Sequence, residues 1–462
     1  MTIDKSQLKA KYCLYIFILA LIFRVFIINV ANTDKIAPDG IGYYRLAYNL
    51  AEGNGYTSKN GEKYFFREPG YPIFLSLAFQ ITKLAGFETG TLKFDNSFRL
   101  NNDVPEITVA KYMQAILDSL TCVLLFLIFS SVIKNRFAFI ISVIFCFYFP
   151  YAYHTTSILR EVLQAFLAIS LCYTLLQYFL KDKIIYLIFT GFLLGLLNLT
   201  FQVSVVFLVS IPIFIWVFKK SFIKAIVPSL IIVMIMLLTA SPWLCRTYND
   251  YPDWRIVKSF GTSFTPELRN WGYSVLNAEY FGLITEKEMN DIHREEWYGL
   301  TDDEKFKLSL DGTFTKKADS INALIDEPLI SKRKLKNYGA YFFRAWFAYP
   351  SYLPAALLNQ EGVMGRELIK KYPIYTALLM LPVFIIGFFA FLGLLIYFRK
   401  FFIINIIFIT FMSVFFLIAN EPRRMLPAIP FIFLYGIMGM IYCYYRFIRH
   451  KKNSEIDLLL LK

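Results

Sequence analysis

The sequence predicts an all-α integral membrane protein with about ten transmembrane helices. Of its 462 residues, 57% are hydrophobic and only 18% are charged, and the mean hydropathy is +0.50. Soluble domains carry about a quarter charged residues. The apolar residues gather in runs of about 17 to 25, long enough to cross a bilayer core as helix. The runs lack the polar–apolar alternation of a membrane β-barrel, and helices satisfy their own backbone groups in lipid.

The first apolar run, residues 12–30, follows Lys5, Lys9 and Lys11. It is longer than the apolar part of a signal peptide and lacks an A-x-A cleavage pattern, which favours a retained anchor over a cleaved leader. Arg24 within this run is expected to face the bundle or to snorkel outward, because a charge facing lipid is costly. The later runs are residues 107–133, 137–153, 162–180, 184–200, 201–218, 225–243, 373–398, 401–419 and 425–447.

Basic residues gather in short loops beside the apolar runs, and the net charge is +14. With about ten spans and a cytoplasmic N-terminus, all these loops fall on the cytoplasmic side, as the positive-inside rule requires. The charge therefore does not call for a nucleic-acid partner. The loop and tail residues concerned are Lys134, Arg136, Lys181, Lys183, Lys219, Lys220, Lys224, Arg399, Lys400, Arg446, Arg449, Lys451 and Lys452.

The runs divide the chain into three regions. Residues 1–243 are expected to form an N-terminal transmembrane module that contains a first external loop, residues 31–106. Residues 244–372 form a second external region, and residues 373–462 form the last transmembrane helices and a basic cytoplasmic tail. The apolar segment 71–86 is too short for a span, and counting it as one would reverse the sidedness of the basic loops. We expect it to be an interfacial or re-entrant helix that lies on the outer surface.

The six cysteines and three histidines form neither a disulfide nor a metal-binding pattern. No two cysteines are closely spaced, and the histidines lie far apart in the chain. The densest acidic cluster, Asp302 to Glu304, lies in a charged stretch and is expected to be plain surface. We therefore expect no metal and no other cofactor. These features also fit a bacterial inner membrane.

The first external loop carries a polar motif directly after the first span. Asp39 stands between Pro38 and Gly40 and opens an amphipathic helical pattern that ends at Gly53 and Gly55. A carboxylate at the start of a membrane-surface helix is placed to meet a lipid head group. The alternative role for Asp39 is that of a helix N-cap. The apolar face of this pattern consists of Tyr43, Leu46, Ala47 and Leu50.

Further motifs follow in the chain. In the same loop, a charged pair meets a rigid turn, which in the simplest interpretation is a turn with a surface ion pair. Its sequence is Arg67-Glu68-Pro69-Gly70-Tyr71-Pro72. The others are Thr155-Thr156-Ser157-Ile158-Leu159-Arg160-Glu161, Ser241-Pro242-Trp243-Leu244-Cys245-Arg246-Thr247-Tyr248 and Glu421-Pro422-Arg423-Arg424-Met425-Leu426-Pro427-Ala428-Ile429-Pro430.

In their order and shared sidedness, these motifs resemble those of the GT-C membrane glycosyltransferases. The branch they resemble most is the one that includes protein O-mannosyltransferases and the lipid A aminoarabinose transferase. One departure is Thr247, where the Pro-Trp-x-x-Arg-Asn-Tyr element of the family has Asn. The resemblance implies a helical bundle with external interfacial helices in the first loop and a small external region before the last three spans.

The resemblance also implies a reaction, in which a sugar passes from a polyprenyl phosphate to an acceptor hydroxyl on the external face. Asp39 would be the general base that takes the proton of the attacking hydroxyl, so the product would be inverted. The lipid-linked sugar is then a co-substrate, and a glycan, a lipid or a protein could be the acceptor. The departing lipid phosphate needs no general acid, but it does need positive charge.

Arginine supplies that charge in a fixed, forked geometry. Arg246 leads the candidates on its motif match, and the others are Arg67, Arg423 and Arg424. Interfacial anchoring is the alternative role for these arginines.

Four residues of the same motifs are expected to support the site, namely Glu161, Glu68, Tyr43 and Tyr71. Glu161 would orient a neighbour or form an ion pair at a helix start, and a second catalytic acid is the alternative. Glu68 is expected to orient Arg67.

Two other classes of membrane protein share part of this pattern. A ligase or polymerase of lipid-linked glycans would share the sidedness but not the motif order from Asp39 to Pro72. A secondary transporter usually has inverted repeats and polar groups near the membrane midplane. Because the polar motifs here gather on one face, the sequence favours an enzyme that works at a membrane surface.

Overall fold

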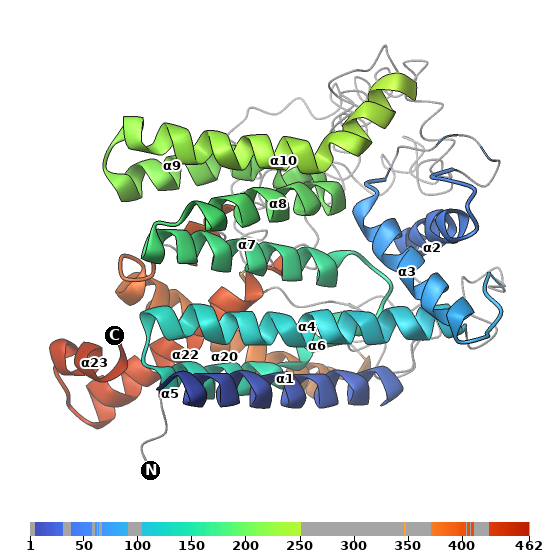
Figure 1. Ribbon diagram of the computed structural model, residues 1–462. Helices are drawn as coiled ribbons and strands as arrows, with labels where there is room; N and C mark the ends of the chain where they lie inside the picture. The colour runs from blue at the N-terminus through green and yellow to red at the C-terminus, as the bar shows by residue number, and fades with distance from the viewer. Residues whose placement is uncertain are drawn as a thin grey trace, which may run out of the picture.

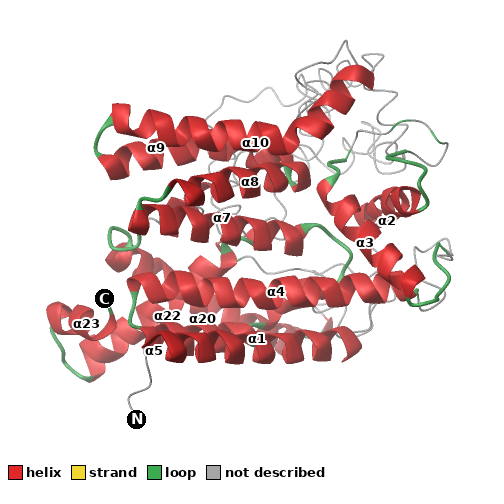
Figure 2. Cartoon of the chain, in the orientation of Figure 1, coloured by secondary structure: helices red, strands yellow, loops and turns green. Residues whose placement is uncertain are grey.

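The regular elements of the computed structural model are helices, most of them long and roughly parallel (Figures 1 and 2). The structure describes residues 5–30, 38–57, 61, 63, 67–90, 104–250, 346–347, 371–402, 404–406, 408–410 and 425–461. Within these residues β-type pairing is confined to isolated bridges. The described part of the chain therefore confirms the predicted all-α architecture, while most of the predicted external region 244–372 lies outside it.

The N-terminal module is a stack of long helices with short connections. Its elements are α1 (Lys5–Val30), α4 (Pro105–Val132), α5 (Asn135–Cys146), α6 (Phe149–Ala152), η1 (Tyr153–Thr156), α7 (Glu161–Lys181), α8 (Ile184–Thr200), η2 (Gln202–Val206), α9 (Phe207–Lys219) and α10 (Phe222–Asp250). Along the stack α1 packs on α4, α4 on α7, α7 on α8 and α8 on α10. α7 and α9 are followed by Asp182 and Lys220, which adopt the left-handed conformation typical of residues that follow a helix.

The described residues confirm only part of the predicted number of membrane spans. Six of the described helices are long and apolar enough to cross a membrane, and α5 with its continuation through η1 makes a seventh if the 58° bend between them lies within one span. α8 and the helical segment 204–219 are apolar but shorter. The predicted run 401–419 lies partly outside the described residues. The chain is thus a multi-pass membrane protein, and ten spans are not confirmed.

The C-terminal helices α20 (Pro373–Tyr397) and α22 (Ile429–Cys443) pack against each other at glycines. A Cβ atom at Gly393 would lie 2.0 Å from the carbonyl oxygen of Tyr435, and one at Gly439 would lie 2.2 Å from that of Phe389. Small residues let helix backbones approach closely in membranes, where van der Waals packing is a main source of association.

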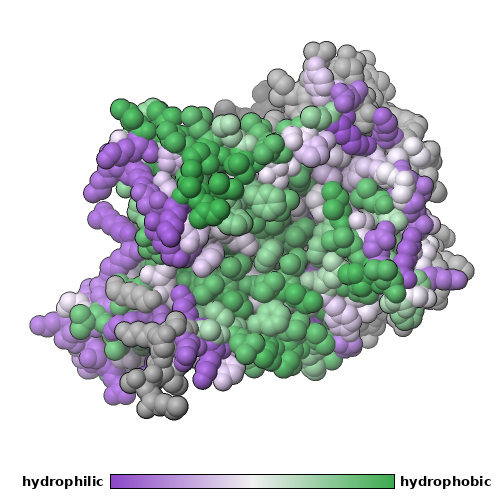
Figure 3. Space-filling model, viewed as in Figure 1, coloured by the Kyte–Doolittle hydropathy of each residue, from purple (hydrophilic) through white to green (hydrophobic). Residues whose placement is uncertain are grey.

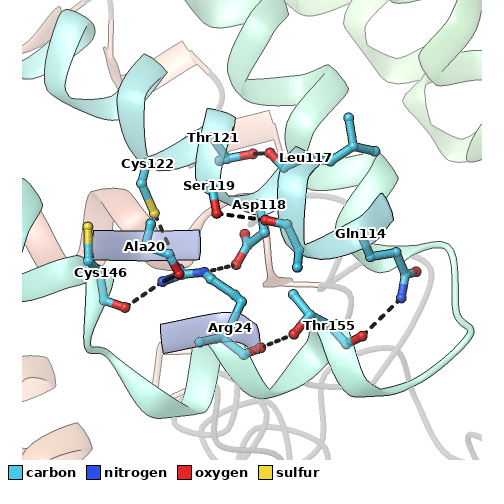
Figure 4. Close-up of polar contacts among 12 residues, drawn as sticks. Ala20, Arg24, Gln114, Leu117, Asp118, Ser119, Thr121, Cys122, Cys146 and Thr155 are labelled. Atoms are coloured by element: carbon cyan, nitrogen blue, oxygen red, sulfur yellow. Dashed lines mark hydrogen bonds and ion pairs between the residues drawn. The ribbon is translucent and has the colours of Figure 1, made fainter. Parts of the chain in front are cut away.

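A buried ion pair joins α1 to α4 (Figure 4). The Nε of Arg24 donates to a carboxylate oxygen of Asp118 at 2.8 Å, and both side chains are at most 2% exposed. The guanidinium also donates to the carbonyl of Cys146 at 2.5 Å and to the sulfur of Cys122 at 3.2 Å. Of the two orientations expected for Arg24, the structure therefore shows the one that faces the bundle.

The end of the chain forms a short helix, α23 (Asn453–Leu460), that packs back onto the bundle. Ile456 and Leu460 are fully buried. The Nζ of Lys134, in the loop between α4 and α5, donates to the carbonyl of Leu458 at 2.5 Å. Lys400, which follows α20, pairs with Asp457 at 2.5 Å. The tail helix thus joins the N-terminal module to the C-terminal helices.

The two ends of the bundle differ in what they carry. The N-terminus, the loops α4–α5, α7–α8 and α9–α10, and the tail helix α23 lie at one end, and α2 (Pro38–Ala51) and α3 (Gly70–Leu84) lie at the other (Figure 1). The space-filling view shows hydrophilic residues at both ends and a mainly hydrophobic surface between them (Figure 3). The basic loops predicted to share one side therefore do meet at one end.

Candidate functional site

The candidate site is built on α2 and α3, which pack together beside the first turns of α4 (Figure 1). α3 runs across the direction of the long helices (Figure 1). Its buried face includes Tyr71, Leu75 and Phe79, which form a small core with α2. Asp39 is the second residue of α2, and its side chain lies outside the described part of the structure. The helical backbone nevertheless places Asp39 and Tyr43 in the first turns of α2.

Arg67 lies against the first turns of α2. Its guanidinium carbon is 4.9 Å from the ring centroid of Tyr43, a cation–π arrangement. Gly42 makes room for this side chain, because a Cβ there would lie 2.8 Å from the Nε of Arg67. Tyr43 follows Asp39 by four residues, and residues spaced in this way are neighbours on a helix surface. The charge of Arg67 is therefore held against the first turns of α2.

Tyr56 connects Arg67 to Arg246. The hydroxyl of Tyr56 donates to the carbonyl of Arg67 at 2.8 Å, and the guanidinium of Arg246 donates to the carbonyl of Tyr56 at 2.9 Å. Arg246 also stacks on the ring of Trp243 at 4.9 Å and lies 5.5 Å from the centroid of the Tyr56 ring. Two of the predicted phosphate-binding arginines thus contact Tyr56, Arg67 through its backbone carbonyl and Arg246 through its guanidinium.

The pKa of the Tyr56 phenol reflects the burial and the charges around it. Burial, with the nearby carboxylate of Glu68, raises the pKa of Tyr56 well above its ordinary value. The positive charges of Arg67 and Arg246 act in the opposite direction but do not offset the burial. Tyr56 therefore stays protonated and keeps its hydroxyl as a donor to the backbone of the Arg67 segment.

Glu68 forms an ion pair that the sequence does not predict. A carboxylate oxygen of Glu68 lies 2.8 Å from a guanidinium nitrogen of Arg160, and both side chains are less than one-fifth exposed. Arg160 also stacks on the ring of Phe201 at 4.9 Å. The following turn packs on the end of α8, because a Cβ at Gly70 would lie 2.7 Å from the carbonyl oxygen of Leu199. The Pro-Gly turn therefore holds the first loop against the end of α8.

Tyr71 occupies the centre of the aromatic contacts. It is fully buried, and its ring meets the edge of Tyr43 at 4.9 Å between centroids. Its hydroxyl donates to Gln114 at 3.0 Å. Burial, and then the charge of Glu161, raise the pKa of Tyr71 well above its ordinary value. Glu161 is the first residue of α7 and is 4% exposed, so this predicted site residue lies close to the same cluster.

Six of the predicted site residues therefore gather at one end of the bundle, namely Tyr43, Arg67, Glu68, Tyr71, Glu161 and Arg246. Arg423 and Arg424 lie outside the described residues. Within the described ranges no three His, Cys, Asp or Glu side chains are grouped so that they could hold a metal ion. The absence of a metal and of a cofactor remains a prediction.

Three residues of the site have no assigned role in the sequence prediction: Tyr56, Gln114 and Arg160. Arg160 stands beside Glu161 in one of the motifs quoted above, so the sequence already shows a positive charge next to a candidate site residue. Gln114 and Asp118 are polar residues one helical turn apart inside an apolar run. Polar residues within a span usually face the bundle interior, and this spacing is the signal that could find them.

The fold is that of known membrane oligosaccharyltransferases. The archaeal oligosaccharyltransferase AglB from Archaeoglobus fulgidus, in complex with an inhibitory peptide and a dolichol-phosphate, matches 96% of this chain with a TM-score of 0.52 and 15% identity. The Archaeoglobus fulgidus oligosaccharyltransferase tethered to an acceptor peptide with an NVT sequon matches 98%, with a TM-score of 0.53 and 15% identity. The apo form matches 98%, with a TM-score of 0.52 and 14% identity.

This likeness confirms the predicted GT-C-like fold. The chain spans about half the length of these proteins, with 52% of the two peptide-bound chains and 53% of the apo chain covered. Because the identity is so low, the likeness shows the fold alone. No protein-family model and no curated protein matches the sequence. The branch that includes O-mannosyltransferases and the aminoarabinose transferase is not confirmed.

Proposed function

We propose that this protein is a membrane glycosyltransferase that moves a sugar from a polyprenyl-phosphate donor to an acceptor hydroxyl. The observation that carries the proposal is that the charges of Arg67 and Arg246 both act on Tyr56, while Arg67 lies over Tyr43 in the helix that contains Asp39. Two fixed positive charges at the edge of a membrane bundle suit a lipid phosphate. The fold supports the same class, since a structure of AglB holds a dolichol-phosphate and a peptide.

In this proposal Asp39 is the general base. Its carboxylate takes the proton of the acceptor hydroxyl while that oxygen attacks the anomeric carbon, and the bond to the lipid phosphate breaks on the opposite side. The sugar is therefore transferred with inversion. The leaving phosphate carries away the electron pair, and Arg246 and Arg67 stabilise its negative charge.

The site faces the external side of the membrane in this proposal. The basic loops and the tail lie at the opposite end of the bundle, and the positive-inside rule assigns that end to the cytoplasm (Figure 1). α2 and α3 then meet the outer leaflet of an inner membrane, where the prenyl chain of the donor lies in lipid. The acceptor, whether glycan, lipid or protein, approaches from outside.

The test is transfer of radiolabelled sugar from polyprenyl-phosphate donors to membrane extracts by the purified full chain. Asp39→Asn keeps the shape of the side chain but removes the base, and transfer should fall by at least about 100-fold. Arg45→Gln is a matched control, because Arg45 lies on the same helix but is exposed. Equal transfer by wild type and Asp39→Asn would contradict the assigned base. No transfer by wild type from any donor would contradict the proposed reaction.

A further inference from the structure

Gln114 joins two segments that carry the candidate site. It lies on α4, inside a membrane span, and is fully buried. Its side-chain oxygen accepts the hydroxyl hydrogen of Tyr71 at 3.0 Å. Its side-chain nitrogen donates to the backbone carbonyl of Thr155 at 3.2 Å (Figure 4). The same nitrogen donates to the backbone carbonyl of Ser157 at 2.9 Å. One amide thus holds α3 and the segment before α7 at the same time.

The geometry fixes the direction of each bond. The two carbonyls can only accept, so the side-chain nitrogen of Gln114 must face them and its oxygen must face Tyr71. Tyr71 must then be the donor, and the raised pKa of this phenol keeps the hydrogen in place. A buried amide that made none of these bonds would destabilise an apolar span. The position of Gln114 therefore lets its amide make these three hydrogen bonds at the same time.

Both segments lead directly to site residues. On one side, the ring of Tyr71 meets Tyr43, and the ring of Tyr43 lies under the guanidinium of Arg67. On the other side, the segment held through Thr155 and Ser157 continues to Arg160 and Glu161. The ion pair between Arg160 and Glu68 joins the same segments at a less buried place. Gln114 makes the inner of these two connections.

We infer that Gln114 is a positioning residue, which sets the first external loop against the segment 155–161 so that Arg67 and Glu161 keep their places in the site. The inference rests on the proposed sugar transfer. Gln114 does not touch the reacting atoms and acts through Tyr71, Tyr43 and the backbone before α7. Its loss should therefore lower turnover more than it weakens donor binding.

The test compares Gln114→Leu, which removes all the bonds of the amide, with Tyr71→Phe, which removes one bond and keeps the ring on Tyr43. We expect kcat of Gln114→Leu to fall about tenfold or more, with a change in donor KM below about threefold. Tyr71→Phe should have a smaller effect, and the double variant should be no worse than Gln114→Leu alone. Thr121→Val is the matched control, because its hydroxyl donates to the carbonyl of Leu117 in the same helix and has no other hydrogen-bond partner among the residues that the structure describes.

A second measurement does not depend on activity. Hydrogen exchange of the full chain in nanodiscs should be faster in Gln114→Leu than in wild type, both in α2 and in residues 155–161, and unchanged in the control. Unchanged exchange, or unchanged kcat per folded molecule, would overturn the role of Gln114. Faster exchange in the variant, with no transfer by wild type, would overturn the proposed reaction and show only the link between the two segments.

Discussion

The guanidinium of Arg246, near the end of α10, donates a hydrogen bond to the backbone carbonyl of Tyr56, a residue 190 positions earlier in the chain. The same guanidinium stacks on Trp243, one turn back on its own helix. The stacking and the hydrogen bond together hold the guanidinium plane in one orientation at the end of α10.

From this arrangement we predict that Arg246→Lys impairs sugar transfer although it keeps the charge. Lysine cannot form the fork or stack as a plane, so phosphate binding and the bond to Tyr56 cannot be made together. Transfer should fall about tenfold or more, and Arg246→Gln should fall further. The measurement is kcat/KM for the polyprenyl-phosphate donor. A fully active Arg246→Lys would show that charge alone is sufficient.

Gly42 offers a way to move Arg67 without changing its charge. A methyl group at this position would meet the flexible end of the Arg67 side chain at 2.8 Å, so the chain should fold but the guanidinium should leave its place over Tyr43. We expect Gly42→Ala to lower transfer about tenfold.

The effect of Gly42→Ala should disappear in an Arg67→Ala background, because no guanidinium is then left to displace. Transfer rates of the two single variants and the double variant provide the check. Additive losses would mean that Gly42 acts through something other than Arg67.

The sequence predicted the fold class for a physical reason, and the same reason explains why six of its candidate site residues lie at one end of the bundle. Apolar runs of bilayer length and basic loops are properties of single segments, and the polar motifs stand beside them in the chain. The contacts between Arg246 and Tyr56, or between Arg160 and Glu68, depend on how distant segments meet. No spacing within one segment encodes such a meeting, so these pairings required the structure.

The span count shows the same limit. Hydropathy finds apolar runs, but it does not show the 58° bend that separates α5 from the helical segment 149–156. Pro150, next to the start of α6, cannot donate a backbone hydrogen bond, which fits a break at this point.

The tail helix α23 should contribute to stability. Truncation after Lys452 removes the buried Ile456 and Leu460 and the ion pair between Lys400 and Asp457. Full burial of one such apolar side chain stabilises a fold by about 1.5 to 3 kcal/mol. We expect the melting temperature in detergent to fall by several degrees. Leu458→Ser is the control, because Leu458 is 80% exposed. A truncated chain as stable as wild type would show that the contacts of α23 are incidental.

The buried ion pair between Arg24 and Asp118 should matter more when it is broken than when it is replaced. Asp118→Leu leaves the guanidinium of Arg24 buried without its carboxylate, and the loss of one partner from such a pair costs about 3 to 5 kcal/mol. Arg24→Met likewise leaves the carboxylate of Asp118 buried without its guanidinium partner. Each single variant should therefore lower the yield of folded protein and its melting temperature strongly.

The double variant Arg24→Met with Asp118→Leu buries no charge, and apolar side chains of similar volume can fill the space between α1 and α4. We expect it to recover most of the lost stability, because the desolvation of both charges is removed together. The melting temperatures of all four proteins in the same detergent give the coupling energy. If the double variant is as unstable as the sum of the single variants, the two residues act independently. The bonds of Arg24 to Cys122 and Cys146 would then carry its contribution.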